Sequence, residues 1–564
     1  MRVNRLAAAM SLAVSLSITA QALALEHQDV RHVLLISVDG MHALDVARYV
    51  ESHPNSTLKQ LAGHGITYSN ARTPANSDSF PGLLALVTGG SPVTGDLFYD
   101  VSYDRSYFAN GDSTCSGAVS DSAPGAGQSA GRGSPIAFDE SIDLYGTDPV
   151  TGLPLSRNMI NPNSLPFQID SNGHCMPVYP HSALKANTIF EVVRGHGGVT
   201  AWADKHPAYD LVRGPSGAGL DDLYTPEVTN VGGLDNTVSV ICTHENDHLK
   251  TLGIIGWIHG VAHDGTPLKG VPAVFGSDYQ AVSVGQKVSH DTPDPSCINP
   301  STAADAARLS GHPGGYVDGS GTPTDVLSYA LEAVDADLGS IVDALKQQNL
   351  YESTLIIITA KHGQSPINPL KINKPGHFAD LVAALTAANM AETAAMQAVN
   401  IAANCSNGPC GFISDDDIAL IWLQDQTQAA NVAALINNHA RELFVDEVMA
   451  GDEIKLKFHD PMHDNRTPDI IVQPQYGVVY TSSTKKNAEH GGFSFADTNV
   501  GLIVSHAHLP AQIIRTLVLS SQVAPTILHS LGLDPKELKA VRVEGTGVLP
   551  GLQGWSGRWE SNPR

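Results

Sequence analysis

The chain has 564 residues and a formal charge of −24, because 57 acidic side chains outnumber 33 basic ones. So large an acidic excess argues against a protein that binds nucleic acid polymers through their phosphates. The length suffices for one large α/β domain with insertions or for two domains, and it places no limit on the size of a buried core.

The N-terminus has the pattern of a secretory signal peptide. Arg2 and Arg5 precede an apolar run that ends near Ala20, and Ala22-Leu23-Ala24 fits a small-x-small cleavage site. We therefore expect residues 1–24 to be removed and the mature protein to be secreted or periplasmic. A membrane anchor is the alternative, but the run is short for a spanning helix. No later segment is apolar enough to predict a membrane span.

Two chemistry-bearing segments follow early in the chain. A strand-like run over 33–38 ends on Asp39, and Ser79-Phe80-Pro81-Gly82 follows about forty residues later. An acid that ends a buried strand lies at the rim of a sheet, where ligands bind. A hydroxyl at a helix start can serve as a nucleophile. The simpler alternatives are that Asp39 caps a helix and that Ser79 caps the helix that follows it, with the neighbouring Ser77 as a competing hydroxyl.

The next part of the chain alternates between irregular and regular patterns. Residues 99–179 are rich in Gly, Ser, Asn, Asp and Pro and are expected to form a long insertion. A helix is predicted near 188–193 and strands near 199–203 and 271–275. The first of these strands is followed by Asp204-Lys205-His206, a polar cluster that we expect to line a cleft.

A second Gly- and Pro-rich insertion is predicted over 289–324. An amphipathic helix over 325–347 and a buried parallel strand over 355–360 follow it. That strand ends on Lys361-His362-Gly363-Gln364. Strands that alternate with helices predict an α/β fold with a doubly wound, mostly parallel sheet.

The C-terminal part completes the predicted domain. Residues 378–454 are expected to form a cap subdomain, and strands near 468–472 and 500–504 flank a His490-Gly491 segment. Residues 25–564 are therefore interpreted as one catalytic domain with two insertions and a cap.

The six cysteines are even in number, and an oxidising compartment favours disulfides. Cys405 and Cys410 are the best local pair, since the Asn-Gly-Pro sequence between them predicts a turn. A cysteine metal site is the weaker interpretation, because no second close Cys/His pair completes a zinc site.

The order Asp39-Gly40, Ser79-Phe80-Pro81 and Val87-Thr88-Gly89 resembles the entry to the active site of the alkaline phosphatase superfamily. The most similar branch is type I phosphodiesterase/nucleotide pyrophosphatase. The resemblance implies the alkaline phosphatase type of sheet and a site with two divalent metal ions, usually zinc, that clamp the phosphate. It also implies a chain order of ligands that ends in an Asp-His-Gly unit and a late His-Gly.

Carried over residue by residue, the resemblance implies that Ser79 is the nucleophile. It also implies that Asp39, Ser79, His362 and His490 bind metal, so the expected cofactor is a divalent ion, zinc, in one or two copies. The alternative for either histidine is a hydrogen-bonded role within the fold.

Two departures from the family pattern stand out. Lys361 replaces the acid of the Asp-His-Gly unit, and an Asp-x-x-Gly-His unit has only a faint echo at Gly311-His312, where Arg308 occupies the acid's position. Asp278 is another candidate acid. We interpret Lys361 as a catalytic cation that replaces the charge of a lost metal, with an ordinary lysine that extends to solvent as the alternative.

The sequence thus predicts an exported, metal-assisted hydrolase of small phosphate esters, most simply phosphodiesters or nucleotide pyrophosphates. A sulfatase is one alternative, but Leu83 stands where sulfatases need an arginine. A binding protein that has lost metal ligands is the other. Metal analysis separates these hypotheses.

Overall fold

The computed structural model describes residues 30–116, 133–138, 142, 160–229, 235–388, 411–423 and 425–555. The predicted signal peptide and the predicted Cys405–Cys410 pair lie outside the described residues. The division of the chain into one catalytic domain, two insertions and a cap stays a prediction.

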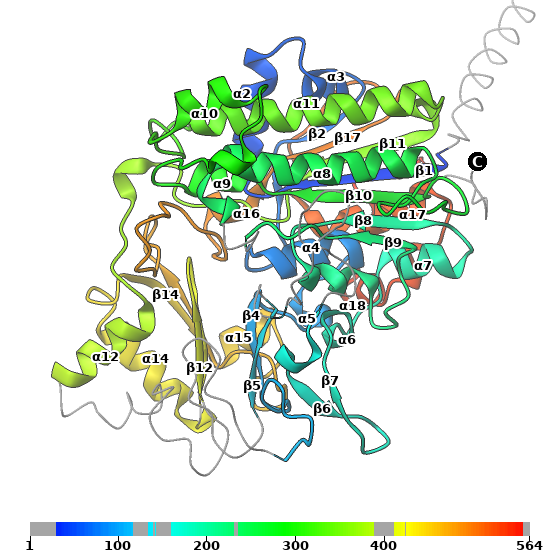
Figure 1. Cartoon of the computed structure of the whole chain (residues 1–564). Helices are drawn as coiled ribbons and strands as arrows, with labels where there is room; N and C mark the ends of the chain where they lie inside the picture. The colour runs from blue at the N-terminus through cyan, green and yellow to red at the C-terminus, as the bar shows by residue number, and fades with distance from the viewer. Residues whose placement is uncertain are drawn as a thin grey trace, which may run out of the picture.

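An eight-stranded sheet runs through the centre of the molecule (Figure 1). From β11 through β1, β10 and β8 to β9 all neighbours are parallel, whereas β17 is antiparallel to both β11 and β2. The predicted α/β fold with a mostly parallel, doubly wound sheet is confirmed. In spatial order the strands are β18 (Gln512–Ile514), β2 (Gly65–Tyr68), β17 (Leu502–Ser505), β11 (Thr354–Thr359), β1 (His32–Val38), β10 (Val274–Tyr279), β8 (Thr200–Ala203) and β9 (Asp222–Tyr224).

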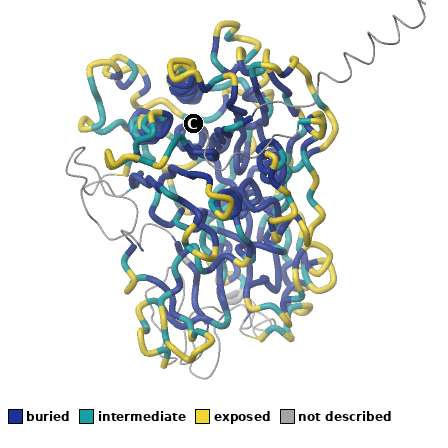
Figure 2. The backbone as a smooth tube through the Cα atoms, turned by 90° about the vertical axis from the view of Figure 1, so that its right-hand side faces the viewer, coloured by how far each residue is buried: buried dark blue, intermediate teal, exposed yellow. Residues whose placement is uncertain are grey.

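Helices cover both faces of this sheet, as α/β packing requires (Figure 1). One face carries α8 (Val240–Ile258), α9 (Ala281–Lys287) and α11 (Asp325–Gln347), and the other carries α4 (Ser79–Thr88), α7 (Ile189–Gly195) and α17 (Val523–Ser530). The central strands are buried throughout, and Figure 2 shows the exposed residues gathered at the periphery.

The boundaries of two elements show how local chemistry decides where they begin. Helix α11 spans the predicted 325–347, and the Thr324 side chain caps it by accepting from the Leu327 N–H. Strand β10 begins at Val274, three residues later than predicted, because Pro272 has no N–H to give to a ladder.

A second, four-stranded sheet lies beside the main one (Figure 1). Its order is β12 (Phe412–Asp415), β13 (Ala419–Trp422), β15 (Ile470–Pro474) and β14 (Val445–Ala450), and α14 (Ala429–Asn438) shares a hydrophobic cluster with it.

The remaining strands are β3 (Ala71–Arg72), β4 (Val101–Asp104), β5 (Ser134–Ala137), β6 (Phe167–Ile169), β7 (Cys175–Pro177), β16 (Asn499–Val500) and β19 (Val518–Leu519). The remaining α-helices are α2 (Ala43–Ser52), α3 (Thr57–Gly63), α5 (Pro92–Gly95), α6 (Pro180–Ala183), α10 (Ala303–Leu309), α12 (Phe378–Ala388), α15 (Asp452–Lys457), α16 (Phe495–Thr498) and α18 (Lys539–Glu544).

Disulfides join Cys115 to Cys175 and Cys242 to Cys297. Among the described residues, no helix combines the length and the apolar character that a membrane crossing needs.

A buried arginine ties three distant segments together. Arg466 is 1% exposed; its Nε donates to Asp104 at 2.5 Å, its Nη1 donates to the Ala183 carbonyl at 2.6 Å, and its Nη2 donates to Tyr107. Several hydrogen bonds and an opposite charge satisfy the guanidinium, so removing it would leave a buried carboxylate without its partner.

Arg466→Met is expected to lower the free energy of unfolding by about 3–5 kcal/mol, the usual cost of breaking a buried ion pair. Arg308→Met is the matched control, because its ion pair with Asp305 is exposed and such pairs contribute at most about 1 kcal/mol. Urea denaturation followed by circular dichroism measures both. Equal midpoints for the two variants would contradict the structural role of Arg466.

Two histidines of α8 flank one acid of α11. His244 Nε2 and His248 Nδ1 lie 3.3 and 2.8 Å from the two carboxylate oxygens of Asp337. Burial would lower the pKa of His244, but its interaction with Asp337 outweighs burial and raises that pKa. The hydrogen bond from His248 to Asp337 is the main cause of the raised pKa of His248.

The raised pKa values predict a pH-dependent contribution to stability. This contribution is complete below the usual histidine pKa of about 6.5 and is lost as the pH rises through the higher folded values. We expect the Tm difference between wild type and a His244→Gln/His248→Gln variant to shrink on going from pH 6 to alkaline pH. Thermal melts at each pH measure this difference. A Tm difference that is the same at every pH would show that neither histidine pairs as a cation with Asp337.

Candidate active site

Four neighbouring strands bring polar side chains to one edge of the main sheet. Asp39 follows β1, Asp278 lies near the end of β10, Lys361 and His362 follow β11, and Lys205 follows β8. The carboxyl ends of parallel strands lie at the same edge, where ligands of α/β sheets bind. Residues far apart in the sequence therefore meet there.

Asp39 stands between two ammonium groups. Its Oδ2 lies 2.9 Å from Lys205 Nζ and 3.2 Å from Lys361 Nζ. Lys361 Nζ also lies 2.8 Å from Asp278 Oδ2 and donates to the Tyr209 hydroxyl at 2.8 Å. Asp39 and Lys361 are fully buried, so each charge depends on the others for its stability.

The pKa values of this cluster follow from burial and mutual pairing. Burial opposes the ionisation of Asp39 most strongly, but Lys205 and Lys361 outweigh it and hold the pKa of Asp39 well below its usual range. Burial would also lower the pKa of Lys361, yet the carboxylates of Asp278 and Asp39 raise it well above its ordinary value. Burial, then the charge of Asp39, raise the pKa of Asp278. At neutral pH the two ammonium groups thus share the charge of Asp39.

The two lysines differ in their access to solvent. Lys205 is 6% exposed, lines a cavity and donates to Gln280 Oε1 at 2.6 Å. Lys361 is fully buried behind it, with its Nζ 4.5 Å from the centre of the Tyr209 ring. The sequence pattern assigned contact with the phosphate to Lys361, whereas the structure places Lys205 on the cavity wall.

Ser79 is the first residue of α4 and lines the same cavity as Lys205. Asp78 caps this helix, and its Oδ2 accepts from the Phe80 N–H at 3.3 Å. A Cβ atom at Gly82 would lie 2.0 Å from the Lys361 carbonyl oxygen. Glycine at position 82 therefore lets α4 lie directly against the segment after β11, which fixes the start of the helix relative to Lys361.

His362 and His490 stack with their ring centres 3.8 Å apart. His362 Nε2 lies 3.5 Å from Asp39 Oδ1, and His490 Nδ1 lies 3.1 Å from Asp78 Oδ1. These four atoms are buried and lack a hydrogen-bond partner among the described residues. Burial lowers the pKa of both imidazoles, and the adjacent His362 and the Lys287 ammonium group lower that of His490 further. Both rings are therefore neutral at neutral pH.

The cavity beside Ser79 has a volume of about 230 Å³. Aromatic rings, among them Phe80 and Tyr209, form part of its wall. Cations outnumber anions there, although the whole chain carries a formal charge of −24. The acidic and lysine side chains on the wall are Asp100, Lys205, Asp235, Lys287, Lys485 and Lys486.

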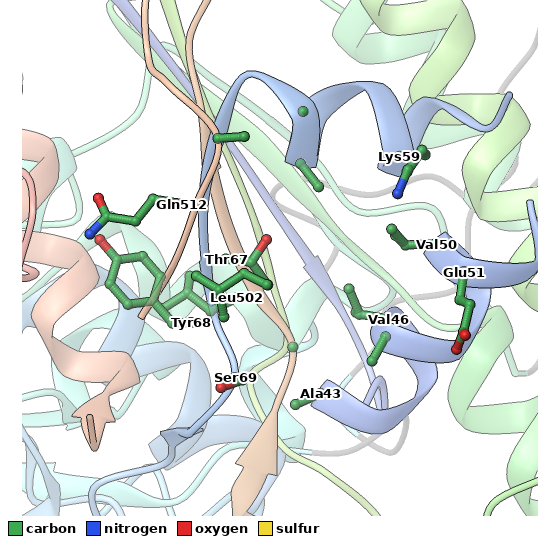
Figure 3. A pocket seen from close by; sticks show the side chains of 16 residues that line it. Ala43, Val46, Val50, Glu51, Lys59, Thr67, Tyr68, Ser69, Leu502 and Gln512 are labelled. Atoms are coloured by element: carbon green, nitrogen blue, oxygen red, sulfur yellow. The ribbon is translucent and has the colours of Figure 1, made fainter. Parts of the chain in front are cut away.

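A larger, mostly apolar groove of about 650 Å³ lies elsewhere, between α2, α3 and the strands β2, β17 and β18. Figure 3 shows Val46 and Val50 of α2 and Lys59 of α3 on one side of it and Thr67 and Leu502 of the strands on the other. It contains none of the predicted site residues, so its size does not make it the active site.

The structure brings most of the candidate residues together. Asp39, Lys361 and His362 are in direct contact, and His490 stacks on His362 and shares the cavity with Ser79. His312, the faint echo of the Asp-x-x-Gly-His unit, is exposed in the loop after α10.

Sequence reasoning gave no role to three residues of the site. Asp78 adjoins Ser79 and faces His490, Lys205 reaches Asp39, and Tyr209 covers both lysines. The available signal was the polar cluster after the strand at 199–203, from which Lys205 comes.

The donor set does not fit the two ions that the resemblance implies. Both ammonium groups occupy the Oδ2 side of Asp39, and position 361 holds a cation instead of an acid. The four buried atoms without a hydrogen-bond partner form two pairs, one of Asp39 with His362 and one of Asp78 with His490. Within the described part of the chain, no three His, Cys, Asp or Glu side chains converge as a metal site would require.

Comparison with a solved alkaline phosphatase supports the fold. Alkaline phosphatase PafA is 12% identical, with a TM-score of 0.55 over 89% of this chain and 95% of that one. A murine ectonucleotide pyrophosphatase/phosphodiesterase 5, an inactive variant in complex with AMP, is 14% identical, with a TM-score of 0.47 over 88% of this chain and 94% of that one. No curated protein matches the sequence.

The family model for type I phosphodiesterase/nucleotide pyrophosphatase matches residues 33–130 and 310–496, which together make up just over half of the chain. The matched ranges include Asp39, Ser79, Lys361, His362 and His490. The chain therefore belongs to the type I phosphodiesterase/nucleotide pyrophosphatase family and is a phosphoester hydrolase of this type.

Proposed function

We propose that the chain hydrolyses phosphodiesters or nucleotide pyrophosphates through a covalent intermediate on Ser79. The observation that carries this proposal is that Ser79 and the Lys205 ammonium line one cavity. A nucleophile and a fixed cation beside the same space are the two parts that attack on phosphorus needs.

In the first step the Ser79 oxygen forms a bond to phosphorus while the bond from phosphorus to the leaving oxygen breaks. The hydroxyl proton passes from Ser79 to water, and the leaving oxygen takes up a proton from water. Water then cleaves the bond between Ser79 and phosphorus, so that the sum is ester plus water to acid plus alcohol. Lys205 stabilises the charge on the non-bridging oxygens in both transition states.

Asp39 and Lys361 position Lys205 in this scheme. Asp39 Oδ2 holds Lys205 Nζ at 2.9 Å, and Gln280 Oε1 accepts a second bond from it at 2.6 Å. Lys361 keeps Asp39 ionised from the buried side. The charge that metal ions supply in the family is thus supplied here by side chains.

The test is turnover of an aryl phosphodiester by the purified protein, with an acid-quenched sample analysed by mass spectrometry. We expect release of the aryl alcohol and a peptide in which Ser79 carries the remaining half of the substrate, its phosphate still esterified to the second organic group. Tight binding of the diester without any turnover would instead support the binding-protein alternative.

Elemental analysis of the purified protein is expected to find fewer than two divalent ions per chain. The reason is that two ammonium groups beside Asp39 repel a cation strongly where solvent is scarce. A Lys205→Gln/Lys361→Asp variant should bind more zinc than wild type in the same assay. Two zinc ions in the wild-type protein would contradict the replacement of metal by lysine.

Export is part of the proposal. The signal-like N-terminus and the disulfides Cys115–Cys175 and Cys242–Cys297 support a secreted or periplasmic protein. Its substrate would be a small phosphate ester from that compartment.

A further inference from the structure

The cavity beside Ser79 contains a second group of cations that the proposed reaction does not use. Lys287 ends α9, and Lys485 and Lys486 lie in the segment that leads to His490. All three line the cavity together with Ser79. We call these three lysines the lysine rim.

The backbone fixes the rim in place. The Ser289 N–H donates to the Lys485 carbonyl at 2.8 Å, and the Asn487 N–H donates to the Lys287 carbonyl at 2.7 Å. Val288 and Lys486 form an isolated antiparallel bridge between the same two segments. Two short segments far apart in the sequence are thus paired so that their lysines share one wall.

A buried acid orients two of the three side chains. Glu489 is 1% exposed, and its two oxygens lie 2.6 Å from Lys287 Nζ and 2.5 Å from Lys486 Nζ. An ammonium group has three N–H donors, so a contact with Glu489 leaves donors on each. Lys485 is 68% exposed and lies 3.8 Å from Asp235.

The charges of the rim favour an oxyanion. Glu489 faces two ammonium groups, and Lys485, 3.8 Å from Asp235, adds a third cation at the same wall. Asp416 is also close enough to act on Lys287 and Lys486, but burial raises its pKa well above the usual range, so three lysines outnumber the two ionised acids that pair with them. In a chain with a formal charge of −24, an anionic substrate gains attraction only where lysines are concentrated. In the proposed reaction, Lys205 already stabilises the phosphate group that reacts at Ser79, so the rim lysines are not needed for it.

We propose that the lysine rim binds a second phosphate group of the substrate, separate from the one that Ser79 attacks. The preferred substrate is therefore a phosphoester that carries another phosphate on its organic part. Several ammonium groups on one wall match the several oxygens and the double charge of such a group. This inference rests on the proposed function, because it assigns the reacting phosphate to Ser79.

The kinetic test compares two probes with the same scissile bond and leaving group. They are the p-nitrophenyl ester of thymidine 5′-phosphate and the same compound with a 3′-phosphate. Because hydrogen bonds to charged groups are stronger than neutral ones, wild type should show a kcat/KM at least roughly tenfold higher for the second probe. Equal values for the two probes would overturn the proposal.

Substitutions then locate the effect. Lys485→Ala, which leaves the Glu489 pairs intact, should reduce the preference several-fold, and Lys486→Met should reduce it further. Lys486→Arg keeps the charge and should retain most of it. Lys346→Ala removes an exposed lysine from α11 and is the matched control. A preference that survives the rim substitutions places the second phosphate elsewhere and refutes the role of the rim.

A binding experiment separates this inference from the proposed reaction. In calorimetry with Ser79→Ala, thymidine 3′,5′-bisphosphate should bind at least roughly tenfold more tightly than thymidine 5′-phosphate, and added salt should weaken the difference. Equal affinities, or no binding of either nucleotide, would overturn the rim proposal. An unchanged rate in Ser79→Ala would overturn the covalent reaction alone.

Discussion

Ser79→Ala is expected to reduce hydrolysis of an aryl phosphodiester by roughly 10³-fold or more, as removal of a nucleophile does in other covalent hydrolases. Ser79 begins α4 on the wall of the cavity, and no other oxygen is assigned to attack phosphorus. The fold should be retained, because the change removes one small oxygen. Steady-state kinetics with purified protein and a thermal melt measure the two effects.

Ser77→Ala is the control for this substitution. Ser77 was the competing hydroxyl in the sequence, but it is buried and donates to the Asp497 carbonyl. Its loss should leave the rate within a few-fold of wild type. The assignment to Ser79 would not survive the opposite pattern, in which Ser77→Ala is inactive and Ser79→Ala active.

Lys205→Met should lower kcat/KM for the same diester by roughly 10²–10³-fold, the usual cost of losing one preorganised donor to a developing oxyanion. Lys205 is the ammonium that combines contact with Asp39 and a place on the cavity wall. Lys205→Arg keeps the charge with a different shape and should recover part of the rate.

Lys346→Met is the matched control for the lost charge, since Lys346 is exposed on α11. A rate for Lys205→Met close to that of this control would show that Lys205 holds Asp39 in place without acting on the phosphate. Measuring kcat/KM at two ionic strengths separates direct contact between Lys205 and the phosphate from long-range attraction of the substrate. Salt screens the long-range attraction strongly and the buried contact much less.

The sequence predicted those parts of the fold whose pattern is set by burial alone. Every residue of β11 is buried, so its sequence is a continuous apolar run. One face of α11 is buried, so its apolar side chains recur at helical spacing. Both patterns therefore predicted the element correctly. The start of β10 was missed because Pro272 interrupts pairing without interrupting hydrophobicity.

The candidate site was predictable where a residue ends a strand. Asp39 and His362 belong to this class, and their positions follow from the strand order. Lys205 was noticed only as part of a polar cluster, because its contact with Asp39 depends on how β8 and β1 lie on either side of β10. The direction of the Lys361 side chain, inward under Tyr209, is likewise a property of packing that no local pattern contains.

The sharing of Asp39 by two lysines makes the ionic state of the site strongly epistatic. Lys361→Asp alone would restore the family's acid, yet Lys205 would still stand 2.9 Å from Asp39, and a third carboxylate would adjoin Asp39 and Asp278. Lys205→Gln alone would leave the Lys361 ammonium in the place of an ion. Neither single step both frees Asp39 from its ammonium partners and supplies the acid, so only the paired change replaces the lysine arrangement by the family's acid. The proposed lysine-based site and a metal-based site on this fold thus differ by two coupled substitutions, and neither is expected to convert one into the other by itself.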